Sequence, residues 1–124
     1  MKVYIAAPYK DKTKMSKIAE KVTAAGHTIT HAWWDVEVSD EKNPTAKELR
    51  RQAEADVEGV RRADVVLLIN SAKSEGKSLE QGIAIADRKP IIAVGKLGEF
   101  SKNVFHYLRN YTWVTTVEEG IDEL

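Results

Sequence analysis

Two acidic residues occupy positions where a carboxylate could do chemistry. Glu80 follows the loop 70–77, which comes directly after the apolar run 65–69 (VVLLI). Such a run is typical of a buried strand, and in parallel α/β sheets ligands bind beyond the carboxyl ends of the strands. We expect a helix to begin near Ser78, which would place Glu80 in its first turn. There the helix dipole keeps a carboxylate ionised and available as a nucleophile, although it would equally favour an acid with no role beyond helix stability.

Asp56 is the second carboxylate of interest. It belongs to the long charged segment 45–62, where it shares a side with Val57 and Val60. An acid on the apolar side of a helix is either paired or functional, because burying a lone charge is costly. The alternative is a solvated helix charge. Tyr4 lies within the first expected strand, as a core aromatic or as a phenol directed at a polar partner.

Groups that suit a phosphate fall at the same edge of the expected sheet. Ser74 and Ser78 offer hydroxyl donors, and Gly76 lets backbone N–H groups approach closely. The helix expected from Ser78 directs its positive end toward the same space. Ser78 is equally suited to a purely structural role as a helix cap.

Strands and helices that alternate along the chain would position these residues. We predict strands at 2–7, 28–31, 65–69, 91–94 and 111–115, and helices at 14–25, 45–62, 78–86, 105–108 and 117–124. The unit 63–95 is a strand, a helix and a strand, whose crossover should be right-handed. The alternation predicts one domain, 1–124, with a three-layer α/β/α sandwich. Its five-stranded parallel sheet should have the flavodoxin-like order 2-1-3-4-5.

The composition argues against several classes of protein. Nineteen basic and nineteen acidic residues cancel, so no charge imbalance indicates a nucleic acid or a membrane as partner. The absence of cysteine excludes disulfides and thiol catalysis. No signal peptide or apolar run of membrane-spanning length is recognised, so a cytoplasmic location is expected.

Motifs for cofactors are also missing from the sequence. Neither the G-x-G-x-x-G nor the G-x-x-x-x-G-K-[ST] pattern occurs, which removes the main support for a dinucleotide-binding or P-loop function. His27, His31 and His106 have no metal-ligand spacing. We therefore expect no metal, and a structural or surface role for each histidine.

Three blocks of sequence resemble the nucleoside 2-deoxyribosyltransferase family, which includes the 2′-deoxynucleoside 5′-monophosphate N-glycosidases. They are V-Y-I around Tyr4, A-D-V-E-G-V-R-R-A-D-V-V around Asp56, and G-K-S-L-E-Q-G-I-A-I-A around Glu80. The resemblance runs over nearly the whole chain. It implies that Glu80 is the nucleophile, Asp56 the acid/base group near the leaving nucleobase, and Tyr4 the residue that orients Glu80.

This resemblance implies a reaction and a substrate. The N-glycosidic bond of a 2′-deoxynucleoside would be cleaved through a glycosyl ester on Glu80, which passes to water or to another nucleobase without any cofactor. Ser74 and Lys10 occupy positions where the monophosphate hydrolases carry a serine and a basic residue, which favours a 5′-monophosphate. Lys10 could instead be simply solvated.

The resemblance also implies a homo-oligomer, with a dimer as the minimal unit. Asn103, in the segment 101–104, is similar to an asparagine with which the transferases complete a neighbouring subunit's site. The sequence departs from the family at Ser78, where a glycine is usual, and matches it weakly around Trp34. That tryptophan could stack on the nucleobase, although core packing is the safer interpretation.

Two other functions stay open on the sequence alone. One is a nucleotide-binding module without turnover, and the other is a glycosidase that acts on another nucleotide such as NAD. The presence of Tyr4, Asp56 and Glu80 together favours an enzyme, since a pure binding protein has no need of a nucleophile.

Overall fold

A computed structural model describes the whole chain, residues 1–124. Five parallel strands form one sheet in the order β2-β1-β3-β4-β5, which confirms the predicted fold class. The strands are β1 (Lys2–Ala6), β2 (Thr28–Ile29), β3 (Val65–Ile69), β4 (Ile91–Val94) and β5 (Tyr111–Val114). The strand β2 is two residues shorter at its end than predicted, and β1 and β5 are each one residue shorter.

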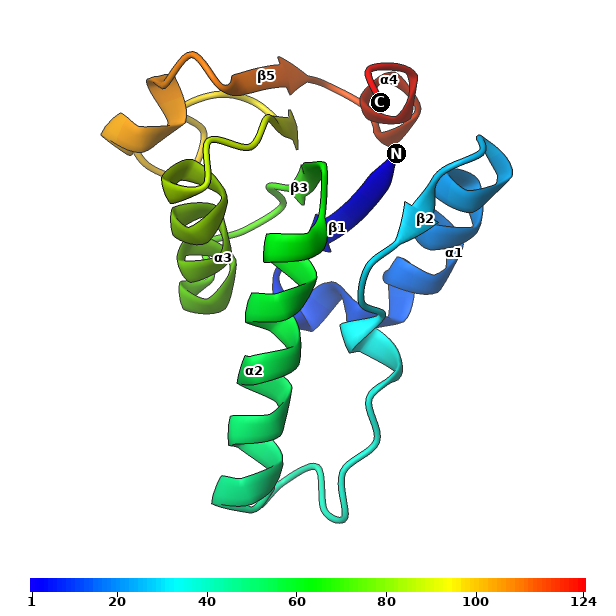
Figure 1. The fold of residues 1–124 in the computed structure, drawn as a ribbon. Coiled ribbons are helices and arrows are strands. Elements are labelled where there is room, and N and C mark those ends of the chain that lie inside the picture. Colours follow the sequence, from blue (N-terminus) through cyan, green and yellow to red (C-terminus); the bar gives the residue numbers. More distant parts are fainter.

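Four α-helices cover the sheet on its two faces (Figure 1). They are α1 (Lys12–Ala24), α2 (Ala46–Arg62), α3 (Glu75–Ala86) and α4 (Val117–Asp122). Three 3-10 helices, η1 (Tyr9–Asp11), η2 (Trp33–Asp35) and η3 (Val104–Tyr107), complete the structure. Only η3 lies where the sequence predicted a helix. None of the helices is long and apolar enough to cross a membrane.

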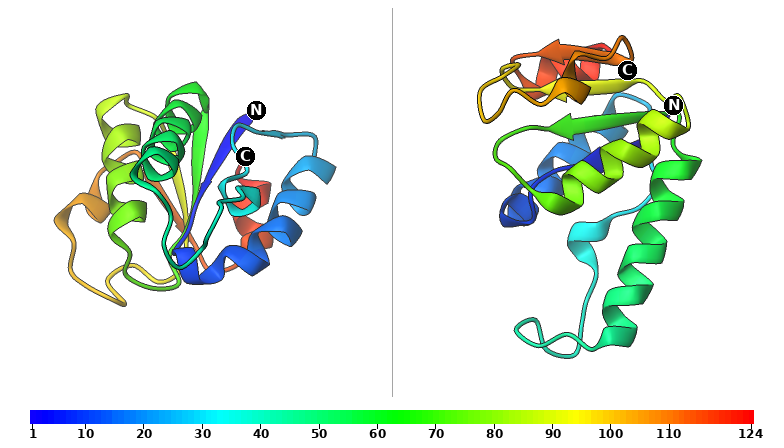
Figure 2. Two further views of the ribbon diagram at one scale, coloured as in Figure 1. Left: turned by 90° about the horizontal axis from the view of Figure 1, so that it is seen from below. Right: turned by 90° about the vertical axis from the view of Figure 1, so that its left-hand side faces the viewer.

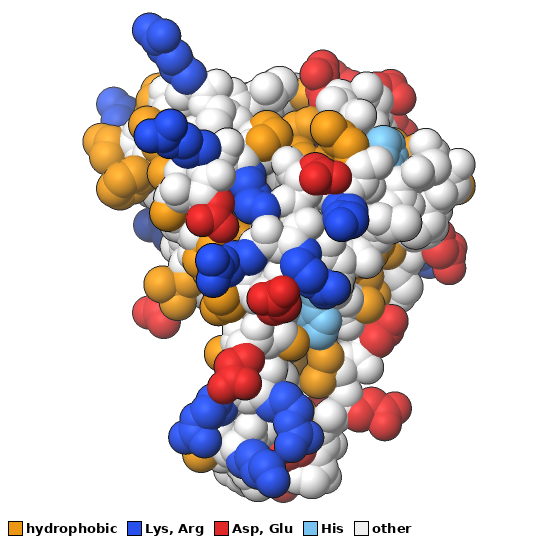
Figure 3. Space-filling view, viewed as in Figure 1, with side chains coloured by type: hydrophobic (Ala, Val, Ile, Leu, Met, Phe, Trp, Pro, Cys, Tyr) orange, Lys and Arg blue, Asp and Glu red, His pale blue; other side chains and the backbone are white.

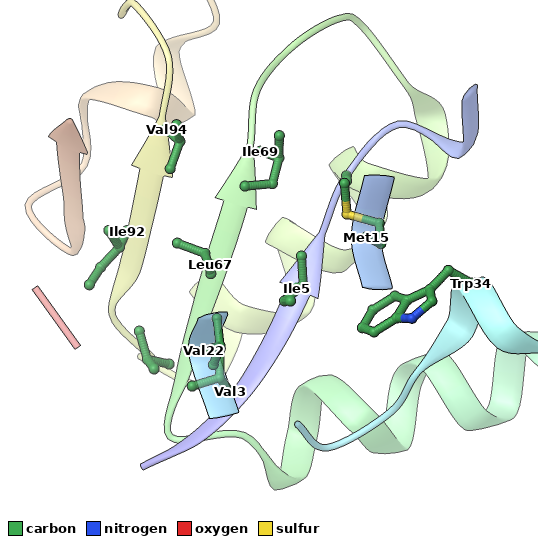
Figure 4. Close-up of a cluster of buried hydrophobic side chains, with 11 residues drawn as sticks. Val3, Ile5, Met15, Val22, Trp34, Leu67, Ile69, Ile92 and Val94 are labelled. Carbon is green, nitrogen blue, oxygen red and sulfur yellow. The ribbon is translucent and has the colours of Figure 1, made fainter. Parts of the chain in front are cut away.

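The alternation of side chains along β1 divides the core into two clusters. Val3 and Ile5 face α1 and α4, where they pack with Met15 and Leu67 (Figure 4). Tyr4, one position along, points to the opposite face, which α2 and α3 cover. The pleat of β1 therefore directs the Tyr4 side chain toward the two helices that carry Asp56 and Glu80.

The start of α3 differs from the prediction. The helix begins at Glu75, and Ser74 is its N-cap, with the hydroxyl accepting a hydrogen bond from the Lys77 N–H at 3.4 Å. Ser78 is not a cap, because its hydroxyl donates to the Ser74 carbonyl at 3.0 Å within the helix. The prediction failed because Gly76, a residue typical of loops, lies in the first turn. Glu80 is consequently in the second turn, where the helix dipole is weaker.

The helix α2 begins as predicted and extends well beyond the sheet (Figure 2). Thr45 and Glu48 form a capping box in which each side chain bonds the other's backbone N–H, at 3.1 and 3.0 Å. This reciprocal cap satisfies two backbone N–H groups at a helix end that makes little contact with the core. The protruding half of α2 and the segment before it form the lower part of Figure 1.

Trp34 is 7 % exposed and lies in the core against Met15 and Ile5 (Figure 4). This burial favours core packing, which was already the safer interpretation from the sequence, over stacking on a nucleobase. Its neighbour Trp33 donates an indole N–H to the Ile5 carbonyl at 2.7 Å. Both tryptophans fix the irregular segment after β2 to the sheet.

Candidate active site

Three residues from three elements meet between the sheet, α2 and α3. The Tyr4 hydroxyl, from β1, donates a hydrogen bond to Oε2 of Glu80, from α3. The carboxyl group of Asp56, from α2, lies near enough to influence the pKa of both. The structure thus brings together the three residues to which the sequence assigned catalysis, although Tyr4 and Glu80 are 76 positions apart.

Gly59 makes this close meeting of α2 and β1 possible. A Cβ atom added at Gly59 would lie 3.0 Å from the ring of Tyr4 and 2.9 Å from Cβ of His31. Such distances are too short, so any side chain here would push α2 away from the sheet. Asp56, one helical turn before Gly59, is held over Tyr4 by this backbone approach.

Burial controls the protonation of the carboxyl groups. It raises the pKa of Glu80 to about 8, with a further increase from the charge of Asp56 and an opposing effect of the Tyr4 hydrogen bond. Burial also raises the pKa of Asp56, against the effects of His31 and Tyr4. Two neighbouring carboxyl groups in a desolvated site resist simultaneous ionisation, so the pair retains a proton near neutral pH.

Tyr4 is a neutral phenol at neutral pH. Burial, followed by the nearby charges of Glu80 and Asp56, raises the pKa of its hydroxyl far above the ordinary value. A phenol can only donate to a carboxylate oxygen. By occupying Oε2 of Glu80, Tyr4 leaves Oε1 as the free oxygen of that carboxylate.

His31 is a member of the site that the sequence did not indicate. Its Nε2 atom lies 3.4 Å from Oδ1 of Asp56, and its side chain is only 20 % exposed. Both atoms are buried and form no hydrogen bond within the protein. Its position just after β2, at the carboxyl edge of the sheet, could have indicated a place in the site. We instead expected a structural or surface role for this histidine.

The predicted substrate-binding residues divide between the two flanks of α3. Gly76 and Glu80 are four residues apart and share one flank, whereas Ser78 and Glu80, two apart, lie on opposite flanks. Ser74, Ser78 and Asn103 line a cavity of about 650 Å³ between the start of α3 and the segment 98–106. Neither Glu80 nor the other two predicted catalytic residues line that cavity.

Asn103 and Lys10 are placed at the surface of the molecule. The side-chain oxygen of Asn103 accepts a hydrogen bond from the Phe105 N–H at 3.0 Å and caps η3. Lys10 is exposed in η1, which follows β1 at the carboxyl edge of the sheet. No group of three or more His, Asp or Glu side chains is arranged to hold a metal ion.

Comparisons with known proteins give the chain a family. The model of the nucleoside 2-deoxyribosyltransferase family matches residues 3–110, and a comparison with curated proteins finds no match. Among solved structures, the 2-deoxyribosyltransferase of Bacillus psychrosaccharolyticus is similar with a TM-score of 0.71 and 19 % identity, over 96 % of this chain and 89 % of that one.

Two further structures share the fold. The CMP N-glycosidase of Clostridium botulinum has a TM-score of 0.64 and 17 % identity, over 99 % of this chain and 97 % of that one. A conserved protein from Enterococcus faecalis V583 has a TM-score of 0.69 and 16 % identity, over 99 % of this chain and 96 % of that one. At such identities the likeness establishes the fold.

Proposed function

The chain belongs to the nucleoside 2-deoxyribosyltransferase family, and from this premise we propose that it cleaves the N-glycosidic bond of 2′-deoxynucleoside 5′-monophosphates. The observation that carries the proposal is the hydrogen bond from buried Tyr4 to Glu80, beside a second, half-buried carboxyl group, Asp56. A nucleophile, an orienting phenol and a proton donor are the groups that glycoside cleavage through a covalent intermediate requires.

In the first step, Oε1 of Glu80 attacks the anomeric carbon of the sugar. The bond between that carbon and the nucleobase breaks, and its electron pair passes to the base nitrogen. The Asp56 carboxyl group donates a proton to the departing base, directly or through a water molecule. The Tyr4 hydrogen bond to Oε2 fixes the plane of the attacking carboxylate.

In the second step, the glycosyl ester on Glu80 is cleaved. Asp56, now ionised, takes a proton from a water molecule whose oxygen attacks the anomeric carbon, and Glu80 departs as a carboxylate. Another nucleobase in place of the water would give transfer. Two displacements at one carbon retain its configuration. His31, at 3.4 Å from Asp56, stabilises the ionised form of Asp56 between the steps.

The 5′-phosphate is supported by the geometry of α3. Its first residue, Glu75, precedes Glu80 by five positions, or about 7.5 Å along the helix axis. A sugar ring can occupy that interval, with its anomeric carbon at Glu80 and its phosphate at the N–H groups of the first turn. Gly76, on the flank of Glu80, allows a close approach, and Ser74 and Lys10 are the candidate side-chain contacts.

We also propose that the active unit is a homodimer. Exposed apolar side chains gather around η3 and the nearby surface of α3, visible on the left of Figure 3. Leu79, Val104, Phe105 and Tyr107 are 72 %, 74 %, 58 % and 59 % exposed. A second copy of the chain would cover this surface and receive Asn103 near its pocket. Light scattering that finds only a 13.9 kDa species at working concentration would contradict the dimer.

The reaction is tested with deoxynucleosides, their 5′-monophosphates and NAD, with free base measured by chromatography. We expect base release from the monophosphates with a higher kcat/KM than from the free nucleosides. Denatured-protein mass spectrometry of Asp56→Asn should detect one added deoxyribosyl phosphate. Binding of nucleotides without release of any base would favour the non-catalytic binding module, and release of nicotinamide alone would favour an NAD glycosidase.

A further inference from the structure

Lys77 is a buried cation that the proposed reaction does not use. It lies in the first turn of α3 and is 4 % exposed, and none of the salt bridges of the protein includes it. Burial lowers the pKa of Lys77 to about 8, with a partial offset from the charge of Asp11. The start of a helix is also the positive end of its dipole, which disfavours a cation. Neither burial nor the helix therefore favours a lysine at this position.

The side chain of Lys77 crosses the loop 70–74, which connects β3 to α3. Its ammonium group donates hydrogen bonds to Oδ1 of Asn70 at 2.6 Å and to the Ala72 carbonyl at 2.5 Å. The backbone N–H of Lys77 donates to the Ser74 hydroxyl at 3.4 Å. Lys77 thus ties the first turn of α3 back to Asn70, the residue that follows β3.

The two halves of this loop are held by different parts of the protein. At its start, the Asn70 N–H donates to the backbone of β4 at 2.9 Å, and the Ser71 hydroxyl donates to the buried carboxyl group of Asp11. Residues 72 and 73 have one hydrogen bond within the protein, the one that the Lys77 ammonium group donates. The part of the loop that leads into α3 therefore depends on Lys77 for its conformation.

We propose that Lys77 is a positioning residue for the 5′-phosphate of the substrate, a role that rests on the proposed function. It holds the loop 70–74 so that the Ser74 hydroxyl and the first N–H groups of α3 are in place before the substrate binds. Two of its three N–H donors bond the loop, so Lys77 acts through the loop. A loop that is ordered in advance lowers the entropy lost when the phosphate binds.

The cost of burying this charge favours a role beyond stability. A buried charge without a counter-ion is unfavourable, whereas a loop fixed before binding improves recognition of the group that it contacts. Stability alone would affect every substrate equally. Selectivity between substrates with and without a phosphate therefore separates the two roles of Lys77.

The first test compares kcat/KM for a 2′-deoxynucleoside 5′-monophosphate with kcat/KM for the free nucleoside. Lys77→Met should lower the value for the monophosphate by about tenfold, mainly through KM, the loss for a hydrogen bond from a charged group. The value for the free nucleoside should change little, because it has no phosphate for the loop to contact. Lys73→Met, at an exposed lysine of the same loop, is the matched control and should keep the wild-type preference.

Asn70→Ala removes an acceptor of Lys77 and leaves the charge of the lysine in place. This variant should lower the preference for the monophosphate as Lys77→Met does. The double variant should lose less than the product of the two single losses, because both substitutions break the same bond. If Lys77→Met does not fold, Asn70→Ala alone carries the test.

Nitrogen-15 relaxation measured by NMR tests the loop independently of any activity. The order parameters of the backbone N–H groups of residues 72–76 should fall from about 0.85 in the wild type to below about 0.6 in Lys77→Met, and not in Lys73→Met. Unchanged order parameters in Lys77→Met, an equal loss of kcat/KM on both substrates, or an equal loss in Lys73→Met would each overturn the proposal. A wild type that releases no base from either substrate would contradict the proposed function and the phosphate role with it, whereas the order parameters would still show whether Lys77 holds the loop.

Discussion

The two flanks of α3 bury ionisable groups of opposite kind. On the flank toward α2, Glu80 and Asp56 lie around a phenol, and burial raises the pKa of both carboxyl groups. On the flank toward η3, Lys77 and His106 lie around an open cavity, and burial lowers the pKa of both. Desolvation thus favours the neutral form on each side, but one side holds on to a proton and the other gives it up. The helix α3 itself contributes Glu80 to the first group and Lys77 to the second.

The largest expected effect is at the proposed nucleophile, Glu80. Glu80→Gln should lower base release by about a thousandfold or more, because an amide cannot form the glycosyl ester. Glu54→Gln, at an exposed acid of α2, is the matched control and should keep full activity. Circular dichroism would verify the fold of both variants. More than a few per cent of residual activity in Glu80→Gln would assign the nucleophile elsewhere.

The next effect is at the proton donor. Asp56→Asn should slow turnover by about a hundredfold, in the range of general acid catalysis, and most strongly for bases that leave poorly. His31→Gln should cause a smaller loss with the same dependence on the leaving group, because it acts through Asp56. Comparing kcat across bases of different basicity measures this dependence. A uniform loss for all bases would mean that these residues only bind the substrate.

The pH dependence of kcat/KM tests whether the carboxyl pair is desolvated. The proposed reaction needs Glu80 ionised and Asp56 protonated, which is the state in which the pair holds one proton. The pKa of Glu80 is raised to about 8, so this proton is lost as pH rises through about 8, and kcat/KM should fall along a basic limb there. kcat/KM reports the ionisation of the free enzyme. Initial rates between pH 5 and 9 at low substrate concentration give this limb. The absence of a basic limb in this range would show that Glu80 is solvated and that its pKa is not raised.

The smallest expected effect is on stability, and its sign differs between the flanks. The folded state binds the Glu80 proton more tightly than the unfolded state does, so the free energy of unfolding should fall as pH rises from 4.5 to about 8. The pKa of Lys77 is lowered from 10.5 to about 8, so the unfolded state binds that proton more tightly. The free energy of unfolding should therefore rise with pH between about 8 and 10.5.

Urea unfolding at several pH values would measure how the free energy of unfolding changes with pH. Glu80→Gln should remove the decrease and stabilise the protein at pH 8 by on the order of 1 kcal/mol. Lys77→Met should remove the increase. Identical pH dependence in the wild type and both variants would show that neither group is desolvated in the folded state.

The sequence predicted the sheet well because its strands are apolar runs between polar segments. The run 65–69 and the run 91–94 occur with the predicted bounds, since buried parallel strands have few alternative structures. The start of α3 was misplaced because a glycine is ambiguous between a loop and the first turn of a helix. The role of Trp34 stayed open between core packing and stacking on a base because an aromatic side chain suits both.

The candidate site was predicted only in part. Tyr4, Asp56 and Glu80 were indicated by the resemblance to a family, and the structure places them together. His31 and Lys77 carry no motif, and their surroundings come from chain segments far away in sequence. Burial decides the chemistry of such residues, and burial depends on how α2 and α3 pack on the sheet.

Gly59 lets the backbone of α2 approach β1 closely, and this approach helps to place the two carboxyl groups. Since a Cβ at this position would meet Tyr4 at 3.0 Å, α2 rests on β1 without an intervening side chain. The placement of the α2 backbone beside β1, and with it the backbone of Asp56, therefore depends on this contact. Substitutions at exposed positions in the protruding half of α2 should therefore leave this placement unchanged, because that half makes little contact with the sheet.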